Sequence, residues 1–319
     1  MDATVVGIDV SKDKLDIAVR PSGDAFSASR DAAGLDAIIA RLAPLSPIAV
    51  AIEATGGFET AAAASLAAAG LPVVVVNPAQ VRAFAKALGK RAKTDPIDAM
   101  VIAHFAEATE PDIRPLPDQA AQHLADLVAR RRQIIGMIVA ERQRQQRLAA
   151  KRLQQSFARL IKALERELSS LDEDIDAAVR GSPAWREKED LLASAPGVGP
   201  TIARTLIAEL PELGALGRKE IAALAGLAPW TRQSGRWKGK SFIGGGRPSL
   251  RAALFMGALV AARYNPALKA FKERLIAAGK PKLVAVIAVA RKLLTILNAM
   301  LRDKKTWRDL QQELAHAKT

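Results

Sequence analysis

Asp95 and Asp98 are two carboxylates whose spacing could do chemistry, in the run Lys93-Thr94-Asp95-Pro96-Ile97-Asp98-Ala99. If this run begins a helix, residues three apart lie on one side of it. Carboxylate oxygens are the ligands that Mg2+ prefers. A structural role fits the same residues, since Asp95 is a good N-cap, Pro96 suits the first helical position, and Asp98 completes a pattern close to a capping box.

Two further acids end hydrophobic runs that read as strands. Asp9 follows an apolar run in the predicted strand 4–10, and Glu53 closes the predicted strand 48–53. Open α/β sheets place their sites at the carboxyl ends of strands. Four converging acids need metal or protons, and two Mg2+ ions would stabilise the attacking and leaving oxygens of phosphoryl transfer. This pattern resembles RNase H-like nucleases; the alternative is that the acids only form turns.

Ser234 is a candidate nucleophile in the rear half of the chain. Residues 230–251 contain six Lys or Arg residues and no acid, and they include Trp230 and Trp237. A serine among guanidinium groups could attack a phosphodiester, and the basic, aromatic segment suits nucleic acid. The candidate contacts are Arg232, Arg236, Lys238, Lys240 and Arg247. The alternative is an ordinary Ser-Gly turn.

Two other stretches are candidates for nucleic-acid binding. Pro196-Gly197-Val198-Gly199 resembles the turn of a helix-hairpin-helix motif, in which backbone N–H groups approach a phosphate; a plain helix–helix turn is the alternative. Arg130, Arg131 and Arg132 begin a strongly basic stretch of a predicted long helix. A solvated helix face would have the same composition.

Three segments follow from periodicity. Residues 1–110 alternate strands and helices, with strands at 4–10, 15–19, 48–53 and 72–76 and helices at 31–43, 59–69 and 77–88, which predicts an α/β domain. Residues 111–190 show a long amphipathic pattern typical of a coiled coil or helical hairpin. Residues 191–319 are mainly helical, with helices at about 249–262, 266–278 and 282–302.

Composition narrows the function. The net charge is +14, and it is uneven: residues 1–110 carry 10 basic and 13 acidic residues, and residues 111–319 carry 37 and 20. This predicts metal chemistry in residues 1–110 and binding of a nucleic-acid phosphate backbone by residues 111–319. The absence of Cys excludes zinc-thiolate sites. The chain also lacks a P-loop sequence, which argues against an ATPase. We expect no signal peptide and no membrane span, because Arg291-Lys292 interrupts the apolar stretch 283–301.

These motifs together resemble the DEDD-type transposases of bacterial insertion sequences (the IS-one-ten family), whose members include bridge-RNA-guided recombinases. The resemblance spans nearly the whole chain. It is carried by Gly7-Ile8-Asp9-Val10-Ser11-Lys12, Glu53-Ala54-Thr55-Gly56-Gly57, Val76-Asn77-Pro78, Lys93 to Ala99, Pro196 to Gly199, Gly226-Leu227-Ala228-Pro229, Gln233-Ser234-Gly235 and the tail from Leu275 to Arg302.

The resemblance implies a RuvC-like (RNase H-like) N-terminal domain at 1–110, a coiled-coil linker at 111–190 and a C-terminal transposase domain at 191–319. It implies that Asp9, Glu53, Asp95 and Asp98 bind Mg2+, two ions per site with Mn2+ able to substitute. Ser234 would form a 5′-phosphoserine link to donor or target DNA, guided by a noncoding RNA.

The resemblance also implies a homo-oligomer, either a dimer or a tetramer, whose active sites combine residues of two chains. It further implies a location in the bacterial cytoplasm, near the nucleoid. Two other functions stay open: a metal-dependent nuclease without a covalent intermediate, and a non-catalytic nucleic-acid-binding protein.

Overall fold

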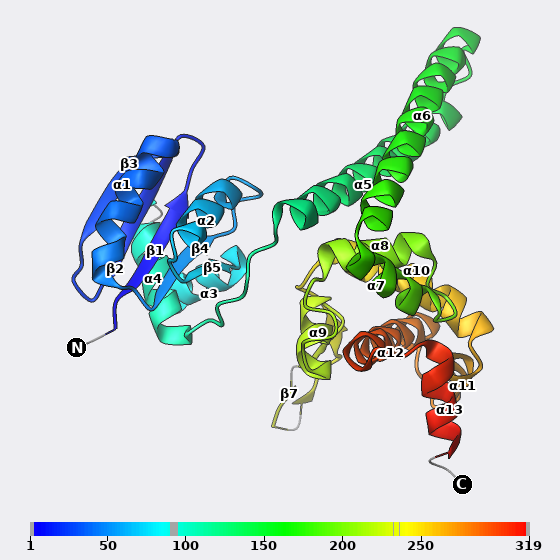
Figure 1. The fold of residues 1–319 in the computed structure, drawn as a ribbon. Helices are drawn as coiled ribbons and strands as arrows, with labels where there is room; N and C mark the ends of the chain where they lie inside the picture. The colour runs from blue at the N-terminus through cyan, green and yellow to red at the C-terminus, as the bar shows by residue number, and fades with distance from the viewer. Residues whose placement is uncertain (1–2, 90–94, 232, 236, 317–319) are drawn as a thin grey trace. The chain divides into compact units, whose positions relative to one another are not determined.

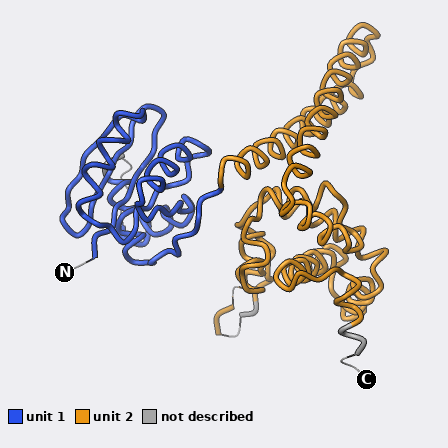
Figure 2. The backbone as a smooth tube through the Cα atoms, viewed as in Figure 1, with its two compact units in different colours: residues 1–117 blue, residues 118–319 orange. Residues whose placement is uncertain are grey.

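The chain forms two compact units, residues 1–117 and 118–319 (Figure 2). The structure is a computed structural model and describes residues 3–89, 95–231, 233–235 and 237–316. The first unit is a mixed α/β layer and the second is mostly helical (Figure 1). This agrees with the division between α/β and helical segments that the periodicity predicts.

The first unit is built on one five-stranded sheet with the order β3-β2-β1-β4-β5. The strands are β1 (Val5–Val10), β2 (Lys14–Arg20), β3 (Ala25–Ser29), β4 (Ala49–Glu53) and β5 (Val73–Val76). β1, β4 and β5 are parallel, whereas β2 and β3 extend the sheet antiparallel on the other side of β1. Sequence periodicity missed β3, whose alternately exposed residues at the sheet edge give only a weak apolar signal.

Helices cover both faces of this sheet. α1 (Ala32–Leu42) and α2 (Glu59–Ala68) pack on the face that carries Val6, Ile8, Val50 and Ile52. α3 (Pro78–Ala87) and α4 (Asp95–Thr109) pack on the face that carries Val5, Ala49 and Ala51. As predicted, Asp31 caps α1, accepting a 2.8 Å hydrogen bond from the Gly34 N–H.

α4 lies unusually close to β1 because residue 7 is glycine. A Cβ atom on Gly7 would lie 2.3 Å from both the Ala103 nitrogen and the Ala99 oxygen. Further along α4, Glu107 accepts a 2.7 Å bond from Arg20, which pairs with Val5 at the start of β1. α4 therefore runs back along β1, and its first turn lies toward the carboxyl end of that strand.

The second unit begins with a helical hairpin, α5 (Gln119–Gln146) and α6 (Lys151–Gly181). Ile134, Ile138, Ile161 and Leu171 form its buried seam. Nearer its base, Leu124 and Val179 pack against Trp185 and Ile207 of the following helices. The hairpin thus shares a core with the helices behind it, so we describe both as one unit.

The rest of the second unit is a helical core. Its helices are α7 (Pro183–Ala193), α8 (Pro200–Glu209), α9 (Arg218–Leu224), α10 (Pro248–Tyr264), α11 (Pro266–Ala277), α12 (Lys282–Asp303) and α13 (Trp307–His316). α12 is the one described helix long and apolar enough to span a membrane, but Val289, Leu293 and Leu297 are fully buried in this core. Its apolar character is therefore explained by packing.

A short non-helical segment between α9 and α10, residues 229–243, interrupts the helices, and we call it the excursion. Two-residue strands β6 (Pro229–Trp230) and β9 (Phe242–Ile243) pair antiparallel at its base. Between them, β7 (Gln233–Ser234) pairs with β8 (Trp237–Lys238). The sequence indicated loops here, and the structure folds them into two small ladders.

Candidate active site

Asp9 and Glu53 lie on adjacent strands, on the same face of the sheet. Ile8 is in register with Ile52 on the parallel pair β1–β4, so the next residue on each strand is one of these acids. Both follow the odd-numbered pattern of Val5 and Ala51, which face α3 and α4, and both are half-buried. The sheet thus brings together two acids that lie far apart in the sequence.

The first turn of α4 lies toward the carboxyl ends of β1 and β4, which we call the acidic edge of the sheet. Asp95 precedes Ala99 by one helical turn, and Ala99 is the residue whose carbonyl approaches Gly7. Asp98 is half-buried, while the side chain of Asp95 is outside the described set. Among the side chains that are described, no three His, Asp or Glu groups come close enough to hold a metal ion. The oxygen-only donor chemistry fits Mg2+, and the backbone places these donors around one edge.

Asp16 is an acid at this edge that sequence reasoning missed. It pairs directly with Asp9 across β1 and β2 and is 2% exposed. The Ser27 hydroxyl donates to its Oδ1 at 2.5 Å, and the Lys14 ammonium lies 3.0 Å from its Oδ2. The alternation Leu15-Asp16-Ile17 could have revealed it. Leu15 and Ile17 face one core of the sheet, so the acid between them must face the opposite side, where Asp9 lies.

Glu59 organises the loop that follows Glu53. Its Oε2 accepts bonds from the Thr55 N–H at 3.0 Å, the Gly57 N–H at 2.8 Å and the Thr55 hydroxyl at 3.1 Å. Burial acts to raise the pKa of Glu59, but these bonds and its own backbone N–H outweigh burial and hold the pKa below its usual value. A single carboxylate therefore fixes the turn beside the acidic edge.

Ser234 lies in the second unit, at the end of β7. It pairs with Trp237, is exposed, and precedes Gly235, whose φ of +56° supplies a left-handed turn. At the base of the excursion the Thr231 and Ser241 hydroxyls lie 3.2 Å apart. The hydroxyl of Ser234 is therefore presented at a hairpin turn.

The predicted basic contacts around Ser234 differ in their surroundings. Lys240 is exposed. Arg247 donates two hydrogen bonds to Glu212, at 2.7 and 2.8 Å, and one to the Glu209 carbonyl, so it fastens the start of α10 to the end of α8. Arg232 and Arg236 lie outside the described residues, as does the side chain of Lys238.

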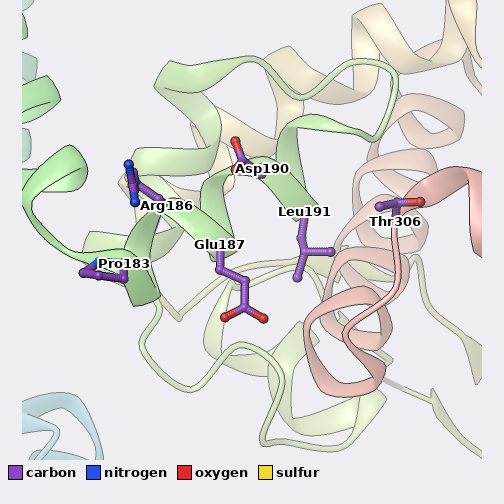
Figure 3. A pocket seen from close by; sticks show the side chains of 6 residues that line it. All are labelled: Pro183, Arg186, Glu187, Asp190, Leu191 and Thr306. Atoms are coloured by element: carbon purple, nitrogen blue, oxygen red, sulfur yellow. The ribbon is translucent and has the colours of Figure 1, made fainter.

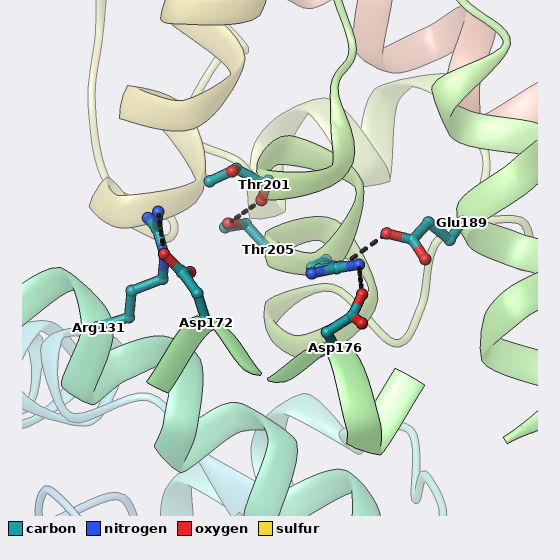
Figure 4. Close-up of polar contacts among 7 residues, drawn as sticks. Arg131, Asp172, Asp176, Glu189, Thr201 and Thr205 are labelled. Carbon is teal, nitrogen blue, oxygen red and sulfur yellow. Dashed lines mark hydrogen bonds and ion pairs between the residues drawn. The ribbon is translucent and has the colours of Figure 1, made fainter. Parts of the chain in front are cut away.

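The arginines predicted on the long helix also have partners within the protein. Arg131 donates to Asp172 at 2.5 Å across the hairpin, and Arg132 pairs with Glu209 of α8. Arg130 bonds Gln133 one turn along. Figure 4 shows Arg131 with Asp172. These partners give Arg131 and Arg132 a structural role that residue spacing could not reveal.

A second ion-pair group, also drawn in Figure 4, lies where α6, α7 and α8 meet. Arg204 donates to Asp176 at 2.5 Å and to Glu189 at 2.7 Å. Burial acts to lower the pKa of Arg204, but the two carboxylates outweigh burial and raise the pKa above its usual value. The hairpin is thereby held to the rear helices by charge as well as by apolar packing.

The turn between α7 and α8 explains one of its two predicted glycines. Gly197 has a φ of +100°, and a Cβ atom there would lie 2.7 Å from Ala261 and from the Gly257 oxygen of α10. Gly197 is therefore required by backbone conformation and close packing. Gly199 caps α8, and a Cβ there would meet nothing within 4 Å. Of the two, Gly199 is the one with open space beside it.

An open pocket of about 440 Å³ lies between α7 and Thr306 (Figure 3). Arg186, Glu187 and Asp190 give it mixed charge, and none of the predicted site residues lines it. We do not assign it to the site.

Known proteins resemble this chain along most of its length. The family model of the DEDD transposases of IS110 matches residues 6–175, and that of the transposase IS116/IS110/IS902 family matches residues 189–273. A pilin gene-inverting protein of Moraxella bovis is 34% identical over 266 residues, 82% of each chain. The corresponding protein of Moraxella lacunata is 33% identical over the same length and share.

A third relative is the 43.6 kDa protein of the insertion element IS110 from Streptomyces coelicolor. It is 31% identical over 150 residues, which are 46% of this chain and 36% of the relative. Together, the two family matches and the long alignments identify the chain as a member of the IS110 family of insertion-sequence transposases, which are DNA recombinases.

Proposed function

We propose that this transposase cuts and rejoins DNA through a covalent link to Ser234. The Ser234 oxygen attacks the scissile phosphorus and loses its proton, while the bond from phosphorus to the 3′ oxygen breaks and that oxygen gains a proton. The products are a 5′-phosphoserine and a free 3′-hydroxyl. Because the link stores the phosphodiester, the reverse attack by a 3′-hydroxyl rejoins DNA without ATP.

The observation that carries this proposal is the setting of Ser234. It is exposed at a hairpin turn, and no Asp or Glu occurs between Glu220 and Glu273. Nine Lys or Arg residues fall within residues 221–272, at positions 232, 236, 238, 240, 247, 251, 263, 269 and 272. Arg247 is already paired with Glu212, but the remaining excess of cations in this segment would attract a phosphodiester, and cations beside Ser234 would stabilise negative charge on the attacking oxygen.

The acidic edge of the first unit supplies the second half of the proposal. Asp9, Glu53, Asp95 and Asp98 would hold Mg2+ in an RNase H-like or RuvC-like domain. When bound, two such ions stabilise negative charge on the attacking and leaving oxygens. Asp9 and Glu53 share a sheet face, and Gly7 lets the start of α4 approach them. We propose that the acids of one protomer serve Ser234 of another within an oligomer.

We also propose that a noncoding RNA encoded by the element selects the DNA. The strongly basic second unit suits a second nucleic acid. Two relatives are named pilin gene-inverting proteins, so cutting and rejoining at paired sites could invert a segment as well as insert one.

Covalent trapping tests the proposal. The protein is incubated with Mg2+, the ends of its element and RNA transcribed from the element's flank, and adducts are sought on a denaturing gel and mapped by mass spectrometry. We expect an adduct at Ser234 that Ser234→Ala abolishes while nucleic-acid binding persists. Cleavage by Ser234→Ala would instead support a metal-dependent nuclease. If omitting the RNA leaves the adduct unchanged, RNA guidance is wrong.

A further inference from the structure

Two exposed aromatic side chains form the base of the excursion that carries Ser234. Trp230 is 57% exposed and Phe242 is 45% exposed. They are directly opposite each other on the antiparallel pair β6–β9, with ring centroids 6.4 Å apart and planes within 24° of parallel. Large aromatic rings usually lose most of their exposure on folding. A paired aromatic surface that stays in solvent is therefore a candidate binding feature.

The surroundings of this aromatic pair favour a polyanion. The pair lies inside the segment 221–272, which carries nine basic residues and no acid, and Lys240, two residues before Phe242, is exposed. Positive charge combined with exposed aromatic rings is how proteins hold single-stranded nucleic acid, because every base has a π-face. An apolar protein partner would not need this charge.

We propose that Trp230 and Phe242 form a stacking platform for an unpaired base of the DNA strand next to the phosphate that Ser234 attacks. Ser234 follows Trp230 by four residues, so the two lie at most about 14 Å apart along the chain. A base stacked there is within a few nucleotides of the cleaved phosphate. The position of the base relative to that phosphate rests on the proposed function of Ser234, while the platform itself does not.

Binding by the full-length Ser234→Ala protein tests the platform without any cleavage. Fluorescence anisotropy compares labelled oligothymidine with a fully paired duplex of equal length. We expect Trp230→Ala and Phe242→Ala each to weaken oligothymidine binding about 5- to 150-fold, because stacking one base is worth about 1–3 kcal/mol. Duplex affinity stays unchanged, since paired bases are already stacked. Tyr264→Ala, which removes a 64% exposed ring from α10, is the matched control and changes neither affinity.

Two conservative variants separate stacking from folding of the small ladder. Trp230→Phe keeps a ring and retains most of the affinity, whereas Trp230→Leu keeps apolar bulk without a π-face and loses it. Equal affinity in Trp230→Leu and wild type, or equal losses on single strand and duplex, would overturn the platform. The same assay with labelled oligouridine tests for RNA. If Trp230→Ala and Phe242→Ala weakened binding of oligouridine but not of oligothymidine, the platform would be an RNA site and the DNA assignment would be wrong.

The two proposals fail separately. If no adduct forms at Ser234 but Trp230→Ala still loses single-strand affinity, the platform stands and the nucleophile is wrong. If Trp230→Leu binds single strands normally and still forms the adduct, the nucleophile stands and the platform is wrong.

Discussion

Replacing Gly7 by alanine should separate the acids of the first unit. The new methyl group would lie 2.3 Å from the Ala103 nitrogen and the Ala99 oxygen, while ordinary contact begins at 3.4 Å, so α4 must retreat by about 1.1 Å. Both obstacles are backbone atoms of a helix and cannot rotate away as a side chain would. Overpacking of this kind costs about 1–3 kcal/mol.

The effect on catalysis should exceed the effect on folding. α4 carries Asp95 and Asp98 in its first turn, so its retreat moves them relative to Asp9. A displacement of about 1 Å at a reacting centre can cost about a hundredfold in rate. We expect Gly7→Ala to lower the rate of adduct formation by about that factor in protein that remains folded.

The assay must report on the first unit. All four tryptophans, at positions 185, 230, 237 and 307, belong to the second unit, so their fluorescence reports that unit. Hydrogen exchange of the β1 and α4 peptides measures the first unit directly. Gly136→Ala is the control, because a Cβ in that α5 position meets nothing within 4 Å and should stabilise the helix by about 0.5–1 kcal/mol. Unchanged exchange and full activity in Gly7→Ala would refute the close approach of α4.

Four other predictions test charged groups and the proposed composite site. Glu59→Gln should weaken the first unit above about pH 4.5 and remove part of its acid sensitivity, because a carboxylate with a lowered pKa stabilises the fold above its unfolded pKa and loses that contribution as pH falls; hydrogen exchange against pH measures this. Arg247→Met should lower stability by about 1 kcal/mol in a denaturant titration, whereas Lys240→Ala should weaken DNA binding without changing stability. Mixing inactive Asp9→Asn and Ser234→Ala proteins should restore some adduct if sites form between protomers, and a silent mixture would place both groups in one chain.

Much of the first unit was predictable because its residues repeat with a simple period. The strands ending near Asp9 and Glu53, the helix capped by Asp31 and the helix beginning near Asp95 follow from apolar alternation and capping residues. The exposed edge strand β3 was missed because only alternate residues are covered. That Asp9 and Glu53 are neighbours depended on their strands being adjacent and parallel, which the strand-end pattern suggested and the register shows.

Several basic residues that the sequence marked for nucleic-acid contact are paired within the protein. Spacing identified Arg131, Arg132 and Arg247 as cations that could face nucleic acid, yet each has a carboxylate partner from a distant part of the chain. Charge density in a sequence does not show which charges are already paired, because the partner of Arg131 is 41 residues away and that of Arg132 is 77 residues away.

The sequence by itself determined the family, the division into an α/β and a helical half, and the identity of the candidate acids and serine, because these depend on local period and motif order. Only the tertiary structure decided that Asp16 lies buried beside Asp9, that Gly7 and Gly197 are places where a helix meets a strand or turn, and that Trp230 and Phe242 share one exposed surface. The physical reason is that contacts between distant residues are set by packing, and packing leaves no periodic signal in the chain.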